Sequence, residues 1–282
     1  MPIKFIRQRS KAAFDRLRVA DLDSSIAKIE AWAGQDFGRY LLHQEQQLLQ
    51  RKYAQLPGYR LMHLGLVMDE QTLTGFDQLH SFHLAPGLAG ASGAAAISNY
   101  AEIPLPSEVV DVAILQHAVE YSASPKAVLA EMSRVVAPGG HMLLFLYNPY
   151  GPMGLLKFPM QLATGRPQYR FHNLRKGRVV DWLSLLNFQV LEIDHGAYNL
   201  PLQRPQWLQQ DSRWDQLGQK IRFPLGNFYM IHGVKREARG IASRAQLWRP
   251  ATSNGYSASR SALSSKGSNK TSNKVSNKHS QR

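Results

Sequence analysis

The chain has 282 residues, of which 44% are hydrophobic, so it is long enough to bury the core of one large α/β domain. Lysine and arginine number 34 and aspartate and glutamate 20, which gives a formal net charge of +14. Residues 235–282 hold 11 of the basic residues and one acidic residue, so the excess charge belongs mainly to this segment. The absence of cysteine excludes a disulfide framework, a zinc–thiolate site and a cysteine nucleophile.

Residues 1–20 form a basic amphipathic stretch, with apolar side chains spaced among the cations. This pattern predicts a solvated helix or arm, and a contact with nucleic acid or an acidic membrane surface is the alternative. The stretch lacks an apolar run of secretory-signal length, so a cytoplasmic location is expected. The longest window without charged residues, 78–101, contains Pro86, Gly87, Gly90 and Gly93, and it is predicted to be short strands and turns rather than a membrane span.

Helical and strand patterns follow one another along the next part of the chain. Two helices are expected from Asp21 and from Asp36, and Gly58 ends this helical region. Short apolar runs then predict strands at 61–67, 79–84, 95–100, 109–117 and 141–148. A helix is expected at 124–136, with Ser124 as its N-cap and Pro138-Gly139-Gly140 as its stop. Helices that alternate with buried strands predict a mostly parallel sheet covered on both faces.

The remainder of the chain is predicted to complete this α/β domain and then to lose its apolar pattern. Residues 148–176 are rich in proline, glycine and aromatic residues and are expected to be a long irregular insertion. A helix at 178–186, a strand at 188–193, a polar amphipathic stretch with Trp207 and Trp214, and a strand at 227–234 follow. The two late strands are expected to lie together at one edge of the sheet. The domain boundaries are therefore 1–55 for the basic arm and helical region, 56–236 for the α/β domain and 237–282 for the tail.

The tail from Ala251 onward combines many serines with lysines at every fourth position and no acidic residue. It offers too little apolar area to offset the entropy of ordering, so it is predicted to be disordered. A helix with lysines on one face is the competing interpretation. Tyr256 is its only aromatic residue, so a tail contact with RNA or another polyanion would be salt-sensitive and non-specific.

Residues 101–151 resemble the class I S-adenosylmethionine-dependent methyltransferases, and specifically their type-11 branch. The resemblance lies in several motifs that occur in the family's order, namely Ile103-Pro104-Leu105, Asp111 opening a strand, Leu115 to Tyr121, Arg134-Val135-Val136 and Pro138-Gly139-Gly140. It extends over about residues 35–236. It implies a Rossmann-like, doubly wound, mostly parallel sheet, a methyl transfer activity, and S-adenosylmethionine as cofactor.

The resemblance also implies where the cofactor would bind. The family's Asp-x-Gly-x-Gly-x-Gly turn falls on His63, Gly65, Val67 and Asp69, and only Gly65 matches, so the glycine loop is degenerate. His83 stands where the family has an acid for the ribose hydroxyls, and Asn99 where an aspartate meets the adenine. Losing the ribose acid removes a charge-assisted hydrogen bond of about 1.5–3 kcal/mol, or roughly tenfold or more in affinity. The full set of implied cofactor contacts is His63, Gly65, His83, Asn99, Tyr100, Leu115 and Gln116.

His117 is the candidate catalytic base, because it follows a parallel strand at the edge of the sheet where ligands bind. The alternative is that His117 caps the strand or stacks on the edge of the cofactor. Glu120 is expected to orient or solvate its surroundings. Tyr147, Asn148 and Tyr150 either line an acceptor pocket or pack beneath the insertion. The remaining histidines show no ligand-like spacing, so no metal site is predicted.

Two functions therefore remain open, and a third hypothesis is that the basic tail targets an active enzyme to RNA or ribosomes. The first is a cytoplasmic S-adenosylmethionine-dependent methyltransferase that acts on an unidentified small molecule, lipid or RNA. The second is a catalytically silent methyltransferase fold that serves as a scaffold or binding module, with the basic tail as its contact surface.

Overall fold

The computed structural model describes residues 19, 22–67, 73, 75–87, 93–201, 218 and 223–236, apart from the side chains of residues 23 and 24. The basic arm, Asp69, the stretch with Trp207 and Trp214, and the tail predicted to be disordered lie outside these residues. Within the described residues, no helix is long and apolar enough to cross a membrane.

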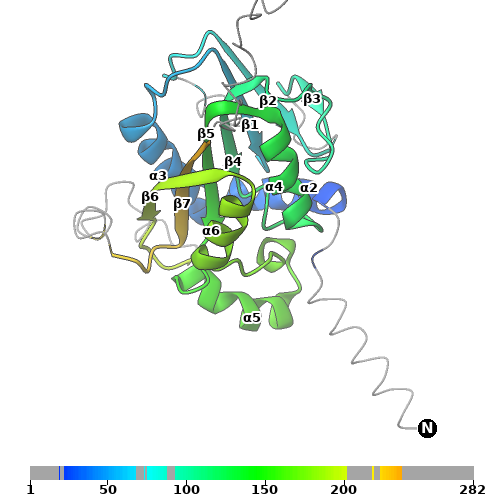
Figure 1. Ribbon diagram of the computed structural model, residues 1–282. Coiled ribbons are helices and arrows are strands. Elements are labelled where there is room, and N and C mark those ends of the chain that lie inside the picture. Colours follow the sequence, from blue (N-terminus) through cyan, green and yellow to red (C-terminus); the bar gives the residue numbers. More distant parts are fainter. Residues whose placement is uncertain are drawn as a thin grey trace, which may run out of the picture. The chain divides into compact units, whose positions relative to one another are not determined.

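Seven strands form one mixed sheet with the order β3-β2-β1-β4-β5-β7-β6 (Figure 1). The strands are β1 Arg60–Gly65, β2 His80–Ala85, β3 Ala96–Ile97, β4 Val110–Gln116, β5 Val136–Tyr147, β6 Phe188–Gly196 and β7 Phe228–Lys235. The first five strands pair in parallel, whereas β7 runs antiparallel to both β5 and β6. The mostly parallel sheet and the late pair of strands at one edge are confirmed.

Helices cover both faces of this sheet. Helices α2 (Leu22–Ala33) and α3 (Asp36–Lys52) share one apolar cluster with alternate residues of the strands, among them Val112 and Ile114 of β4. Helices α4 (Pro125–Val135) and α6 (Lys176–Leu185) share the second cluster with the intervening residues, such as Ala113. Side chains of a strand alternate between faces, so near-continuous apolar strands are required when both faces are buried.

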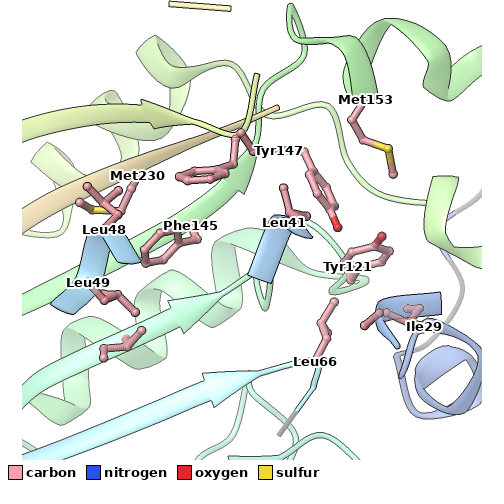
Figure 2. Packing of buried hydrophobic residues seen from close by; sticks show 14 of the residues in the cluster. Ile29, Leu41, Leu48, Leu49, Leu66, Tyr121, Phe145, Tyr147, Met153 and Met230 are labelled. Atoms are coloured by element: carbon pink, nitrogen blue, oxygen red, sulfur yellow. The ribbon is translucent and has the colours of Figure 1, made fainter. Parts of the chain in front are cut away.

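Helix α3 anchors the helical region to the sheet. Leu41, Leu48 and Leu49 are almost completely buried and lie beside Phe145 of β5 and Met230 of β7 (Figure 2). Full burial of a leucine side chain contributes about 1.5–3 kcal/mol. The 3.6-residue spacing of these leucines thus places one face of α3 firmly against the carboxyl half of the sheet.

The prediction of an irregular insertion at 148–176 is wrong, because this segment contains helix α5 (Pro152–Thr164) and the short 3₁₀ helix η2 (Pro167–Tyr169). Proline fits the first turn of a helix, where its missing N–H has no intrahelical partner, and Pro152 occupies such a position. Pro159 lies inside the helix and costs one backbone hydrogen bond. Contacts at the start of the helix offset this loss, including a 2.8 Å hydrogen bond from the Met153 amide to Asn227 Oδ1.

Two local boundaries differ from the sequence prediction. Ser124 is the N-cap residue of α4 as expected, but its side chain makes no capping hydrogen bond. Helix α4 ends at Val135, and Pro138-Gly139-Gly140 lies within β5 rather than between the helix and the strand. Gly139 has a positive φ of 78°, so the motif bends the beginning of the strand next to a register shift in its pairing with β4. The predicted strand at 95–100 is reduced to two residues.

Candidate functional site

The side chains implied as cofactor contacts come from strands whose carboxyl ends meet at one edge of the sheet. His63 of β1 pairs in register with His83 of β2, and Gly65, the last residue of β1, pairs with Gln116 of β4. His117 follows β4 directly. In open parallel sheets this edge is the place where ligands bind.

Four buried side chains at this edge are joined in series by hydrogen bonds. The Nδ1 atoms of His83 and His63 lie 2.9 Å apart, and His63 Nε2 lies 3.1 Å from Gln116 Oε1. Gln116 Nε2 donates a 2.5 Å hydrogen bond to Glu45 Oε2. Burial lowers the pKa of His63 to about 3, helped by its neighbour His83, and lowers the pKa of His83 to about 4. Both imidazoles are therefore neutral near neutral pH, and no carboxylate stands at the position of the ribose acid.

His117 is held between two carboxylates. Its Nε2 lies 2.6 Å from Glu45 Oε1 and its Nδ1 2.6 Å from Glu120 Oε1, and all three side chains are buried. Burial by itself lowers the pKa of His117, but the charges of Glu45 and Glu120 outweigh it and raise the pKa to about 10. The ring also stacks on Tyr147 at a centroid distance of 4.1 Å. His117 is therefore an imidazolium that donates from both nitrogens.

The backbone at His117 has an uncommon conformation. Its φ is 57°, in the left-handed region that non-glycine residues seldom adopt. Its amide donates a 3.2 Å hydrogen bond to the Phe145 carbonyl, which continues the contact between β4 and β5 beyond the last strand residue. An imidazolium with both nitrogens engaged has no lone pair to accept a proton, so this arrangement suits a positioning role better than that of a base.

Sequence reasoning missed Glu45, which lies on α3 and reaches both His117 and Gln116. A signal was present, since Glu45 stands four residues after Leu41 and three before Leu48 on the apolar face of the helix. A carboxylate on a buried face needs a partner. The identity of that partner depends on the packing of α3 against the sheet.

Glu120 connects this cluster to the segment that follows β5. Its Oε1 also accepts a 3.0 Å hydrogen bond from the Tyr147 amide, and its backbone carbonyl accepts one of 2.8 Å from the His172 amide. Glu120 Oε2 and His172 Nε2 are buried and make no hydrogen bond among the described residues. Two buried polar atoms on neighbouring segments are thus without a hydrogen-bond partner among the described residues.

The three residues predicted to line an acceptor pocket differ in burial. Tyr147 is buried against Phe171, and Asn148 is buried with its Nδ2 donating to the carbonyls of Pro224 and Gly226 at 2.8 and 2.9 Å. Tyr150 is instead half exposed.

A cavity of about 480 Å³ opens beside the ends of β2, β3 and β4, within the range of about 300–1,000 Å³ that is usual for small-molecule sites. It is lined by Leu22, Pro86, Gly87, Ile97, Asn99, Tyr100, Ala101, Ser122, Ala123 and Ser124. Asn99 Oδ1 accepts a 3.0 Å hydrogen bond from the Ala101 amide, which shapes the rim. The Tyr100 hydroxyl lies 2.6 Å from the Gly65 carbonyl and 2.9 Å from that of Leu84, so it fastens the ends of β1 and β2 together.

The remaining predicted contacts surround the end of β1. A Cβ at Gly65 would lie 2.8 Å from His63 Cε1, so glycine is needed here because the imidazole occupies the adjacent space. Val67 is half buried and packs against the apolar cluster on the α3 side, whereas Leu115 lies in the cluster on the other face. Among the described residues, no three histidine or carboxylate side chains are grouped in a way that could hold a metal ion.

The sheet order, the antiparallel seventh strand and a cavity at the carboxyl ends of the parallel strands define the class I methyltransferase fold. Residues 66–144 match the methyltransferase domain family known as type 11. The chain therefore has the class I methyltransferase fold, and its residues 66–144 are similar to the type-11 methyltransferase domain.

Known proteins resemble the chain over most of its α/β domain. The uncharacterized protein YafS of Escherichia coli is 24% identical over 175 residues, which are 62% of this chain and 71% of that protein. A Thermotoga maritima S-adenosylmethionine-dependent methyltransferase, described as a possible histamine N-methyltransferase, has a TM-score of 0.53, 14% identity, and coverage of 70% of this chain and 90% of its own. A chain from the complex of the Haloferax volcanii Trm112 methyltransferase activator with a putative methyltransferase has a TM-score of 0.52, 16% identity, and coverage of 74% and 97%. These two structural matches establish the fold.

Proposed function

We propose that the protein transfers a methyl group from S-adenosylmethionine to an acceptor that binds at the carboxyl edge of the sheet, beneath α5. The observation that carries this proposal is the cavity beside Asn99 and Tyr100, at the edge where ligands of parallel sheets bind. The match of residues 66–144 to the methyltransferase domain supports the same reaction class.

The cavity fits the adenosine end of the cofactor in size and in chemistry. Asn99, Tyr100 and the segment 122–124 would hold the adenine through backbone and side-chain polar groups. At the ribose, His83 would replace the usual carboxylate by a neutral imidazole, so binding is expected to be weaker. When bound, S-adenosylmethionine supplies an electrophilic methyl group on a sulfonium.

The chain's own polar groups would position the acceptor. Glu120 Oε2 has no hydrogen-bond donor among the described residues, so it is the atom best suited to accept an N–H or O–H group of the acceptor. His117 would hold the Glu120 side chain in place through the 2.6 Å contact to its other oxygen. The role of His117 as a base stays a prediction, and its two carboxylate partners favour the positioning role instead.

Binding of S-adenosylhomocysteine, measured by isothermal titration, tests the proposal directly. Ala123 lines the cavity and is exposed, so Ala123→Trp is expected to fold normally and to abolish the binding heat by filling the adenine space. Ala127→Trp, at an exposed position further along α4, is the matched control and should bind as the wild type does. No heat from the wild type at hundreds of micromolar would remove the methyl donor from the proposal.

That negative result would favour the second function, a catalytically silent scaffold. The observation that favours a scaffold is that His63 and His83 bond to each other at the place of the two family carboxylates. The cytoplasmic location and a tail contact with RNA or another polyanion stay predictions, because they rest on terminal segments outside the described residues. Deleting residues 251–282 and measuring RNA binding at two salt concentrations tests the tail contact, which unchanged binding would disprove.

A further inference from the structure

Helix α5 carries its polar side chains on the inside and its apolar side chains on the outside. Lys157 and Gln161 are buried, together with Met153 and Gly154. On the opposite face, the exposed apolar residues at positions i, i+3 and i+7 are Leu155, Phe158 and Leu162, with 65%, 51% and 50% of their surfaces accessible. A surface helix of a globular protein normally shows the reverse distribution.

Specific contacts hold α5 in this orientation. Lys157 Nζ donates to the carbonyl of Phe171 and lies 3.3 Å from Asn173 Oδ1, and it also lies 4.7 Å from the centre of the Phe171 ring. Gly154 packs so closely on the Asn148 carbonyl that an added Cβ would overlap it. The outward direction of the apolar residues is therefore built into the fold rather than being the default of a loosely packed helix.

Exposed cations lie near both ends of α5. Residues 148–180 contain six lysines and arginines and no acidic residue. Besides the buried Lys157, Arg166 is exposed two residues after the end of α5, and Arg175, Lys176 and Arg178 are exposed at the start of α6. The Arg175 guanidinium lies 5.9 Å from the centre of the ring of Tyr150, which immediately precedes α5.

We propose that α5 is an interfacial helix that docks on an anionic lipid bilayer. Its 13 residues span about 20 Å, too short to cross a bilayer of about 30 Å hydrocarbon, so the helix would lie in the plane of the surface. Leu155, Phe158 and Leu162 would enter the acyl boundary, while the nearby cations would face acidic headgroups. A second copy of the chain is a poorer occupant, because a two-fold contact would bring these like charges together.

The position of α5 would determine which edge of the sheet faces the bilayer. The helix starts five residues after β5 ends, at the carboxyl edge of the parallel strands, and Figure 1 shows it at the lower end of the domain below α6. Docking through α5 would thus turn the site edge toward the bilayer. The docking does not depend on the proposed methyl transfer, because it requires only the surface of α5.

The cysteine-free sequence allows a site-specific test in the full-length protein. Leu155→Cys is labelled with an environment-sensitive nitrobenzoxadiazole dye and mixed with vesicles of phosphatidylcholine, with or without phosphatidylglycerol. The matched control is Leu79→Cys, which is 82% exposed and precedes β2 at the opposite edge of the sheet. We expect a blue shift and protection from iodide quenching for the label at residue 155, only with phosphatidylglycerol, and no change at residue 79.

The basic terminal segments also attract anionic vesicles, so sedimentation with vesicles is interpreted only together with the label. An unshifted label at residue 155 on protein that sediments with vesicles would overturn the proposal in favour of the terminal segments. A shift without vesicles that grows with protein concentration would overturn it in favour of a second copy.

A serine series provides an independent measure. Replacing Leu155, Phe158 and Leu162 together by serine should weaken partitioning into the anionic vesicles roughly tenfold or more at about 0.3 M salt, where charge contacts are screened. The control triple at the exposed residues Leu79, Leu185 and Leu191 should leave partitioning within about twofold of the wild type. Equal partitioning of the two triples would contradict the proposal.

Discussion

Replacing Glu45 by glutamine tests whether the buried cluster around His117 is an ionic network. In the wild type, Glu45 accepts from His117 Nε2 at 2.6 Å through one oxygen and from Gln116 Nε2 at 2.5 Å through the other. Glutamine keeps the shape but turns one acceptor into an NH₂ donor. That donor would face either the imidazolium or the Gln116 amide, so one buried hydrogen bond must be lost along with one charge.

The expected loss of stability is large. Removing one partner of a buried ion pair costs about 3–5 kcal/mol, because the other charge is left without compensation. A domain has a net stability of only about 5–15 kcal/mol. Glu45→Gln should therefore lower the free energy of unfolding by about a fifth or more. Asp36→Asn on the same helix is the control, because its 2.8 Å salt bridge to Arg39 is exposed and is worth about 1 kcal/mol or less.

The pH dependence separates this mechanism from simple loss of packing. His117 has a pKa near 6.5 when unfolded and about 10 when folded, so its stabilisation is fully present below pH 6.5 and is lost as the pH rises toward 10. The difference corresponds to at most about 5 kcal/mol. Without the Glu45 charge the folded pKa of His117 falls, and the variant should lose less stability than the wild type over this interval.

Urea unfolding followed by circular dichroism, at about pH 6.5 and about pH 9.5, measures both effects. Comparing the variant with the wild type cancels the contributions that other groups titrating in this range make to the free energy of unfolding. Nuclear magnetic resonance of labelled histidine would report the pKa of His117 itself. A Glu45→Gln protein that is as stable as Asp36→Asn would refute the ionic network. So would a Glu45→Gln protein whose free energy of unfolding lies below that of the wild type by the same amount at both pH values.

Three further outcomes are expected. Tyr100→Phe should lower the free energy of unfolding by about 1–3 kcal/mol, measured with urea, because the Gly65 carbonyl loses a buried donor. Gly154→Ala should displace α5, since the new Cβ overlaps a backbone oxygen, and should speed proteolytic cleavage within residues 152–164. Acid should destabilise the protein, because the folded pKa values of His63 and His83 are about 3 and about 4. Their contribution is complete above pH 6.5 and falls below it, so acid titration followed by tryptophan fluorescence should show unfolding by about pH 4.

A specific result would contradict each of these three predictions. Unchanged unfolding of Tyr100→Phe would mean that its hydroxyl is not the donor to the ends of β1 and β2. Wild-type protease resistance of Gly154→Ala would show that the start of α5 can move without loss. Stability that stays constant from about pH 6.5 to about pH 4.5 would show that the two histidines are not desolvated as the structure has them.

The family resemblance in the sequence rests on residues that join one motif or strand to another. Asp111 Oδ2 accepts hydrogen bonds of 2.9 Å from the amides of Tyr59 and Arg60, which fixes the start of β1 beside β4. The Arg134 guanidinium donates to the carbonyls of Ile103 and Leu105 at 2.9 and 2.8 Å, so two of the recognised motifs hold each other. Such motifs, together with apolar periodicity, predict the mostly parallel sheet and the late pair of strands at one edge, whereas the strand order and the antiparallel pairing of β7 come from the structure.

Helix α5 could not be predicted from the sequence, because its sequence features indicate a different structure. Its two prolines indicate a loop, and its apolar pattern indicates a buried face, whereas the structure buries Lys157 and exposes Leu155. The acceptors of the lysine, the Phe171 carbonyl and Asn173 Oδ1, come from a separate segment that no local pattern can identify.

At the edge of the sheet, too, the positions of the histidines were predictable, whereas their protonation was not. Strand periodicity and motif order are enough to place His63, His83 and His117 at the ends of parallel strands. Packing then makes two of them neutral and bonded to each other, while His117 is charged between Glu45 and Glu120. Protonation depends on burial and on neighbouring charges, and the decisive charge, Glu45, comes from a helix 72 residues away along the chain.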